Sequence, residues 1–239
     1  ASVLDALGVA PDAVVQREEL ARALRGLRAD NGEVLRRPGA NGVVNSHDLT
    51  MGAPKSASVL WAQSSAERRA AIEQATREAA EATVRYMALT TGCVQRRVES
   101  GERVWEPARG VASAQFVHHT ARRASAAEVP DPHLHVHCVV VAVERSDGRI
   151  VTPNQAAWMR HGREGGAYFR SELASRLLEL GLEIDSGTGK QGRFFEVAGV
   201  PRDVCERLSG RTREVESAYA AFVARYGRAP VEGELADLA

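Results

Sequence analysis

The stretch FVHHTARRASAAEVPDPHLHVHCVVVA, residues 116–142, is the part of the sequence that best defines the fold. It contains five of the seven histidines of the chain. Three of them, His133, His135 and His137, alternate along a segment that continues into the apolar run 138–143. Successive strand residues point to opposite faces, so the three imidazoles share one face and the residues between them share the other. A β-branched run of this length predicts a central, well-buried strand.

Hydrophobic spacing predicts further helices and strands on both sides of this strand. Helices are expected at residues 12–31, 55–63, 65–91, 154–180 and 201–226. Strands are expected at residues 43–51, 93–100, 103–106, 110–119, 133–145, 149–152, 182–185 and 193–197. Tight turns such as Ser146-Asp147-Gly148 join neighbouring strands, which favours antiparallel pairing. We therefore expect an α+β fold with a central antiparallel sheet flanked by helices.

Composition predicts a globular protein and excludes several classes. A chain of 239 residues with 44% hydrophobic residues suits one domain with a real core. The formal net charge is zero, so any surface that binds nucleic acid must be local. The three cysteines are odd in number and widely spaced, which fits a reducing compartment better than a disulfide scaffold. No apolar run approaches a membrane span and no signal peptide is visible, so we expect a cytoplasmic protein.

Both ends of the sequence resemble internal positions of a longer protein. The chain begins with Ala1 rather than methionine, and it stops inside the helix-like segment GELADLA, residues 233–239. We therefore expect residues 1–239 to be one domain that is truncated at both ends.

The histidines predict a divalent metal site. Three imidazoles leave coordination positions open for water and substrate, as in catalytic rather than structural metal sites. The alternating histidines would supply two ligands from one strand, and a neighbouring strand, 110–119, ends at a third candidate, His118 or His119. Spacing alone leaves open which of these histidines bind the ion. The alternative is a set of polar residues on a solvated sheet face, or one core histidine with its hydrogen bonds satisfied.

A carboxylate on another predicted strand could support this site. Asp48 lies within NSHDLTMGAPKS, residues 45–56, and should point opposite to its apolar neighbour Leu49. A carboxylate on a sheet is costly unless it is paired. It could orient a ligand imidazole or accept a proton from a nucleophile. The alternative is a strand-end residue that caps the following turn.

Basic residues offer candidate contacts to phosphate. Lys55, Ser56 and Ser58 begin a predicted helix, where backbone N–H groups and a lysine suit an anion. Serines are also common at helix starts as caps. Several arginines could line a groove for a nucleic-acid backbone, although most such residues form a solvated face. They are Arg96, Arg97, Arg122, Arg123, Arg160 and Arg163.

Two segments together carry a resemblance to a known family. NSHDLTMGAPKSASVLW, residues 45–61, resembles the DLTFSAPKS segment of conjugative relaxases of the MobF (TrwC/TraI) type. FVHHT followed by DPHLHVHCVVVA resembles their F-x-H-x-T and DPxLHxH segments, and the latter carries the His-hydrophobic-His mark of the HUH endonuclease superfamily. The two motifs in this order are specific, and a weaker likeness runs through most of the chain.

The resemblance implies a nuclease with a defined set of residues. Such relaxases nick single-stranded DNA at the transfer origin of a plasmid or integrative element, and they stay joined to the 5′ phosphate through a tyrosine. His118, His135 and His137 match the metal ligands, and Asp48 matches the carboxylate beside them. One divalent ion is implied, such as magnesium, manganese or zinc, with imidazoles favouring the transition metals. We expect Lys55 and Arg122 to contact the DNA, and the parent protein to carry a fused helicase domain.

The sequence departs from the family pattern at a central point. Relatives carry the catalytic tyrosine close to their N-terminus, and no residue here matches it. The four tyrosines, Tyr86, Tyr168, Tyr219 and Tyr226, fall on predicted helices at apolar spacing. Gly52 stands where relatives usually have serine, and the loop between the histidine motifs is longer. Two further readings therefore remain. One is a tyrosine-less relative that binds single-stranded DNA and metal without cleavage, and the other is a rolling-circle replication initiator that uses Tyr168.

Overall fold

The computed structural model describes residues 2–11, 13–36, 46–122, 129–188, 192–231 and 234. Its strands are β1 (His47–Gly52), β2 (Val94–Arg97), β3 (Arg103–Glu106), β4 (Gly110–Thr120), β5 (Pro132–Glu144), β6 (Ile150–Val151), β7 (Ile184–Thr188) and β8 (Phe194–Val197). Its helices are α1 (Val3–Leu7), α2 (Arg17–Leu24), α3 (Lys55–Gln63), α4 (Ala66–Thr90), α5 (Gln155–Arg160), α6 (Gly162–Glu179), α7 (Arg202–Arg207) and α8 (Gly210–Tyr226).

The histidine-bearing strand β5 is the centre of the main sheet, as predicted. It pairs antiparallel with β1 on one side and with β4 on the other, and β6 pairs with its far end. Val136, in the middle of β5, lies opposite Met51 of β1 and Val117 of β4. The predicted α+β fold with a central antiparallel sheet is therefore confirmed. The hairpins β2–β3 and β7–β8 each form a separate two-stranded sheet.

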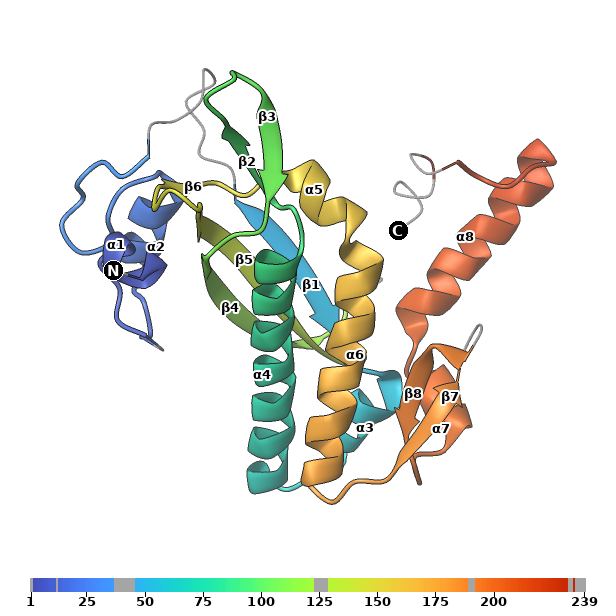
Figure 1. Ribbon diagram of the computed structural model, residues 1–239. Coiled ribbons are helices and arrows are strands. Elements are labelled where there is room, and N and C mark those ends of the chain that lie inside the picture. The colour runs from blue at the N-terminus through green and yellow to red at the C-terminus, as the bar shows by residue number, and fades with distance from the viewer. Residues whose placement is uncertain are drawn as a thin grey trace.

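Two long helices cover one face of this sheet. Figure 1 shows α4 and α6 side by side across β4, β5 and β1. The apolar residues of β5 face these helices and are fully buried: Leu134, Val136, Cys138 and Val140. On α4 the facing positions include Ala75, Ala79 and Ala80, whose small side chains allow a close approach of helix and strands. This layer contains the larger of the two hydrophobic clusters.

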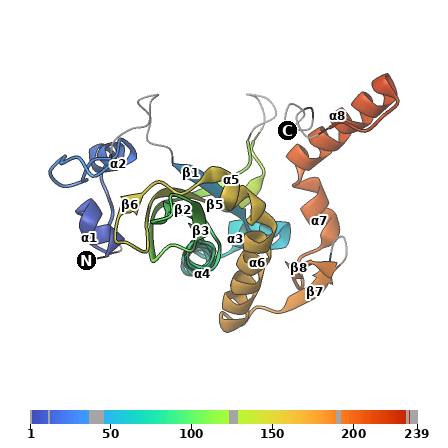
Figure 2. The same cartoon turned by 45° about the horizontal axis from the view of Figure 1, so that its top comes forward.

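The opposite face of the sheet is covered only at one end among the described residues. There α1 and α2 pack on Ala112 and Val141, to one side of the sheet in Figure 2. The short helix α1 is closed by a capping box of Ser2 and Asp5 and ends at Gly8, whose φ of 70° suits glycine. At the other end of the same face lie the histidines.

Three predicted helices differ from the structure. The helix predicted at 12–31 is shortened to α2, because the chain turns at Gly26, with a φ of 82°, and then forms a β-bridge between Leu27 and Val34. The helix predicted at 154–180 is divided into α5 and α6 at His161. That predicted at 201–226 is likewise divided between α7 and α8.

Parts of two other predictions cannot be compared with the structure. Residues 43–45, the predicted start of a strand, and most of the C-terminal segment 233–239 lie outside the described residues. In the part of the chain that the structure describes, no helix combines the length and the apolar character needed to cross a membrane.

Candidate metal centre

Three histidines from two neighbouring strands meet on the open face of the sheet. His118 of β4 lies directly opposite His135 of β5, and His137 is two residues further along β5 on the same face. Each of the three offers one ligand atom, and these atoms lie within 4.8 Å of one another. Within the described ranges, this is the one group of histidine, cysteine or acidic side chains that could hold a metal ion. His135 is buried, whereas His118 is exposed, so the group is open to solvent on one side.

Hydrogen bonds fix two of the imidazoles in the orientation that a metal ligand needs. The Nδ1 of His137 lies 2.7 Å from Oδ2 of Asp48, and Thr50 Oγ1 lies 3.2 Å from the same nitrogen. The Nδ1 of His135 lies 2.9 Å from the carbonyl oxygen of His133. A carbonyl oxygen and a carboxylate can only accept, so each Nδ1 carries the proton and each Nε2 keeps its lone pair for a ligand role. The donor set therefore fits a divalent ion.

Burial keeps part of this group in the form that binds metal. It lowers the pKa of His135, which favours the neutral imidazole needed for coordination. Burial also lowers the pKa of His133, to about 4. His133 lies outside the three-histidine group, although its ring stacks on that of His135 with centroids 4.7 Å apart. Its role in the structure is to present its backbone carbonyl to His135.

A β-bulge interrupts the pairing of β4 and β5 beside His133, although the His133 ring stays on the face of His135 and stacks on it. Between His118 and Thr120 the register shifts, so that His133 and Leu134 of β5 both lie opposite His119 of β4. The backbone N–H of Leu134 donates to Ser58 Oγ at 3.0 Å instead of to a strand. A Cβ at Gly52 would lie 3.3 Å from Cε1 of His133, so glycine here leaves room for that ring.

Asp48 and Thr50 show how β1 supports the centre. Both side chains point to the histidine face, while Leu49 between them packs against the core, as the alternation predicts. Asp48 is 49% exposed, so one of its oxygens meets His137 while the carboxylate remains in contact with solvent. The sequence pattern did not indicate a role for Thr50, although the period of a strand places it on the same face as Asp48, two residues earlier.

The start of α3 differs from the predicted phosphate site. The Lys55 ammonium donates to the carbonyl oxygen of Pro132 at 2.8 Å, and burial lowers the pKa of Lys55. The Ser56 N–H and hydroxyl both donate to the carboxylate of Glu196. Glu196 therefore occupies the anion position at this helix start, and Lys55 fixes the beginning of β5.

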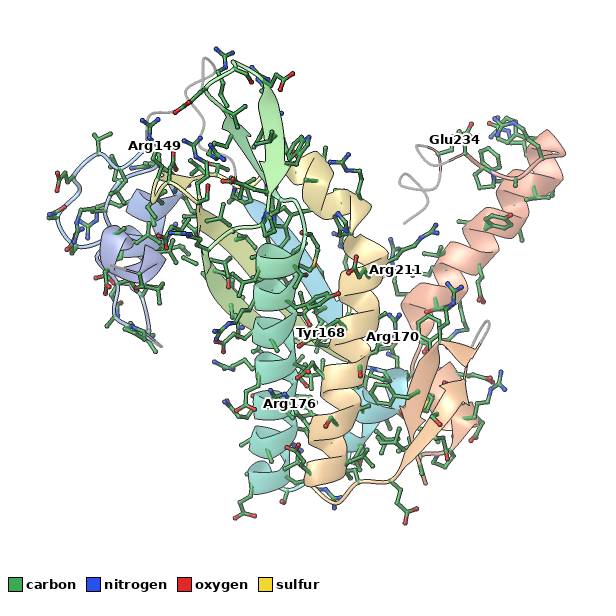
Figure 3. All side chains as sticks on the ribbon, viewed as in Figure 1. Arg149, Tyr168, Arg170, Arg176, Arg211 and Glu234 are labelled. Atoms are coloured by element: carbon green, nitrogen blue, oxygen red, sulfur yellow. The ribbon has the colours of Figure 1, made fainter. Side chains whose placement is uncertain are left out.

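Arg122 lies in a groove near the histidines. The groove has a volume of about 740 Å³ and runs between the connection from β4 to β5 and the helix α8. Its lining includes Asp131, which accepts from the backbone N–H of Gly210 at 2.6 Å, and Arg211, labelled at the start of α8 in Figure 3. Since Arg122 follows His118 by four residues, the groove opens at the same end of the sheet as the metal centre.

None of the four tyrosines lies on the histidine face of the sheet. Tyr168 of α6 stacks on Tyr86 of α4 with ring centroids 4.2 Å apart, and Figure 3 shows it between these two helices. Since α4 and α6 cover the other face, the sheet separates Tyr168 from the histidines. Tyr219 and Tyr226 lie on α8, which extends away from the sheet in Figure 1.

Comparisons with known proteins identify a family for this chain. The family model of the TrwC relaxase matches residues 1–237. The conjugative relaxase TrwC in complex with mutant OriT DNA has 26% sequence identity and a TM-score of 0.76, covering 98% of this chain and 79% of that chain. TrwC with a 27-mer DNA that comprises the recognition hairpin and the cleavage site gives the same four values.

A metal-bound structure of TrwC with OriT DNA has 25% identity and a TM-score of 0.75, with 96% of this chain and 75% of that chain covered. A search of curated protein sequences gave no match. The family model spans nearly the whole chain, and the fold and the histidine group agree with it. The chain therefore belongs to the TrwC relaxase family.

Proposed function

We propose that residues 1–239 form one relaxase domain that nicks single-stranded DNA at a transfer origin and transfers the cut strand. The observation that carries this proposal is the group His118, His135 and His137, whose ligand atoms lie within 4.8 Å of one another in a member of the TrwC relaxase family. Because its substrate would be DNA, we expect the protein to act in the cytoplasm. The parent protein would carry a fused helicase domain.

We assign His118, His135 and His137 as the ligands of one divalent ion. Because His118 is exposed, this group is accessible to a substrate oxygen. When bound, the ion would polarise the scissile phosphate and offset the negative charge that develops on it. Imidazole ligands favour zinc or manganese over magnesium by affinity. Metal-bound TrwC supports a metal in this family.

Asp48 serves this centre in two ways. Through Oδ2 it accepts the Nδ1 proton of His137, which fixes the ring and makes the imidazole a better electron donor. Its half-exposed carboxylate also lies where a nucleophile that approaches the histidines could transfer a proton. The proximity to His137 supports the first role more directly than the second.

The DNA strand would follow the open face of the sheet. Phe116 is 40% exposed and lies opposite His137 on that face, where an unpaired base could stack on its ring. Arg122 in the adjoining groove would contact a phosphate of the same strand. Lys55 would add positive charge at the start of β5, with its position set by Pro132.

The nucleophile would be a tyrosine outside residues 1–239. Its phenolic oxygen would attack the scissile phosphorus, and the bond from phosphorus to the 3′ oxygen would break. The products are a free 3′ hydroxyl and a 5′ phosphotyrosine, which a second 3′ hydroxyl can later reverse to join strands. The positions of Tyr86 and Tyr168 behind the sheet support a nucleophile from elsewhere.

A nicking assay on single-stranded DNA of the cognate transfer origin tests the proposal. We expect the 239-residue chain to bind the DNA and one divalent ion but to form no covalent adduct. A chain extended at its N-terminus to include the upstream reading frame should form an adduct that denaturing gels resolve. His135→Ala should remove both metal binding and adduct. If the His135→Ala variant still bound the ion and still formed the adduct, the proposed centre would be contradicted.

The same assay separates the alternative functions. A relative that binds DNA and metal without cleavage would show no adduct in the extended chain either. The placement of the four tyrosines away from the histidine face is the observation that favours this alternative. A replication initiator that uses Tyr168 would form an adduct in the 239-residue chain, and Tyr168→Phe would abolish it.

A further inference from the structure

His118 receives the least support from its own strand among the three histidines. It lies near the end of β4, which is an edge strand, and regular pairing with β5 is interrupted between His118 and Thr120. The rings of His135 and His137 each have a hydrogen bond at Nδ1, whereas the described residues provide none to the ring of His118. A bulge at the end of an edge strand leaves the backbone free to shift. Contacts outside the strand ladder must therefore fix His118.

Three side chains on the other face of the sheet provide such contacts. The indole of Trp61 from α3 lies parallel to the imidazole of His119, with centroids 4.7 Å apart and an interplanar angle of 5°. Trp61 Nε1 donates to Oε1 of Glu73 from α4 at 2.9 Å. His119 Nε2 lies 3.1 Å from the same oxygen. We name Trp61, Glu73 and His119 the tryptophan cluster.

One carboxylate oxygen connects both rings of the tryptophan cluster. The Trp61 N–H makes the aligned hydrogen bond to Glu73, whereas His119 Nε2 lies close to the same oxygen without the geometry of a hydrogen bond. The guanidinium of Arg69 lies 5.7 Å from the centre of the Trp61 ring. The cluster thus joins α3, α4 and the end of β4.

The position of His119 determines the direction of His118. Neighbouring strand residues point to opposite faces, so a side chain held on the helix-covered face also holds the backbone that directs the next side chain. His119 is the single β4 residue opposite His133 and Leu134, where the ladder gives no regular pairing. A cluster that served stability alone could be placed anywhere along β4.

We propose that Trp61 and Glu73 are positioning residues of the metal centre. They hold His119, and through the shared backbone they keep the imidazole of His118 within reach of the ion that it would share with His135 and His137. This inference rests on the metal ligands assigned in the proposed function. It adds two residues on the opposite side of the sheet that set the metal affinity without touching the ion.

Cobalt(II) binding to the 239-residue chain tests the inference, because the visible absorption of this ion reports its coordination. Trp61→Ala and Glu73→Ala should each weaken cobalt binding about ten-fold, as expected for residues that orient a ligand. Both should also change the absorption spectrum of the bound ion. Trp61→Phe keeps a ring against His119, so it should recover most of the wild-type affinity and spectrum.

A matched control lies on the same helix. Glu78 of α4 forms an ion pair with Arg176 of α6 and accepts from the side chain of Gln74, so Glu78→Ala removes a carboxylate with two contacts that do not involve β4. It should bind cobalt like the wild type. Thermal unfolding of the metal-free variants reports any general loss of stability.

Wild-type affinity and spectrum in Trp61→Ala and Glu73→Ala would overturn the inference, even if these variants unfold at lower temperature. Equal weakening in Glu78→Ala would also overturn it, because the effect would not be specific to the cluster. If the wild-type chain itself binds no cobalt, the proposed metal centre fails first and this inference fails with it.

Discussion

The two faces of β5 differ in what their side chains do. Leu134, Val136, Cys138 and Val140 are fully buried against α4 and α6. On the other face His135 is 8% exposed and His137 is more open, and both rings are held by specific hydrogen bonds. The apolar face is therefore held by close packing and buried area, and the histidine face by a few specific hydrogen bonds.

This difference has a consequence for how each face tolerates change. A buried apolar side chain contributes its transfer free energy and the packing around it, so its truncation lowers global stability. An imidazole on the other face contributes less apolar packing, but its exact direction decides whether an ion can bind. Mutations on the two faces should therefore separate stability from metal binding.

The largest effect on stability is expected at Leu134, next to His135 in sequence and on the opposite face. Leu134→Ala should lower the free energy of unfolding by about 3 kcal/mol, because it opens a cavity in a fully buried site. Chemical denaturation measures this loss. The variant should still bind one divalent ion per chain when it is folded. Complete loss of metal stoichiometry in the folded variant would show that the two faces are not separable.

A smaller and more selective effect is expected at Asp48 on the histidine face. Asp48→Asn keeps the size of the side chain but removes the charged acceptor of the His137 Nδ1 proton, so metal affinity should fall ten- to a hundred-fold. Titration calorimetry measures the affinity, and the free energy of unfolding without metal should change by less than about 1 kcal/mol because the carboxylate is half exposed. Thr50→Val should have a weaker effect, since its contact to the same nitrogen is longer. Equal affinities for Asp48→Asn and the wild type would contradict the orienting role.

The sequence predicts the core face more completely than the histidine face. Alternation and β-branching along residues 133–143 are local signals, so they identify the strand and its buried side chains. The boundaries of α3 were predicted to the residue. The pairing of Asp48 with His137 joins residues 89 positions apart. The strand pattern suggested that Asp48 could orient an imidazole, but only the resemblance to relaxases indicated which histidines are ligands.

Local sequence patterns could not predict two features of the site. The bulge at His133 and Leu134 coincides with a contact between separate elements, in which Ser58 accepts the N–H of Leu134. The anion position at the start of α3 is filled by Glu196, which is 140 residues away from Ser56 in sequence. Periodicity reports which face a side chain occupies, but it cannot report which distant partner satisfies a polar group.

The smallest expected effect concerns pH, and it again separates the two faces. Burial lowers the pKa of folded His133 to about 4, whereas an unfolded histidine titrates near 6.5. Between these values the unfolded chain binds a proton that the folded chain does not, so the free energy of unfolding falls as pH falls from about 6.5 to 4. Because His133 is only partly buried, we expect a loss on the order of 1–2 kcal/mol.

On the core face, burial raises the pKa of Cys138 to about 12, so this thiol stays neutral and adds nothing to the slope. Denaturation of chelator-treated protein between pH 4 and 7 measures the effect. His133→Asn should flatten the slope, while the lowered pKa of His135 leaves a residual dependence of the same sign. If the free energy of unfolding of His133→Asn depended on pH as in the wild type, protonation of His133 would not be the cause of the loss of stability at low pH. The contribution of His133 to the metal centre would then rest on its carbonyl, which accepts from His135, and on the stacking of its ring.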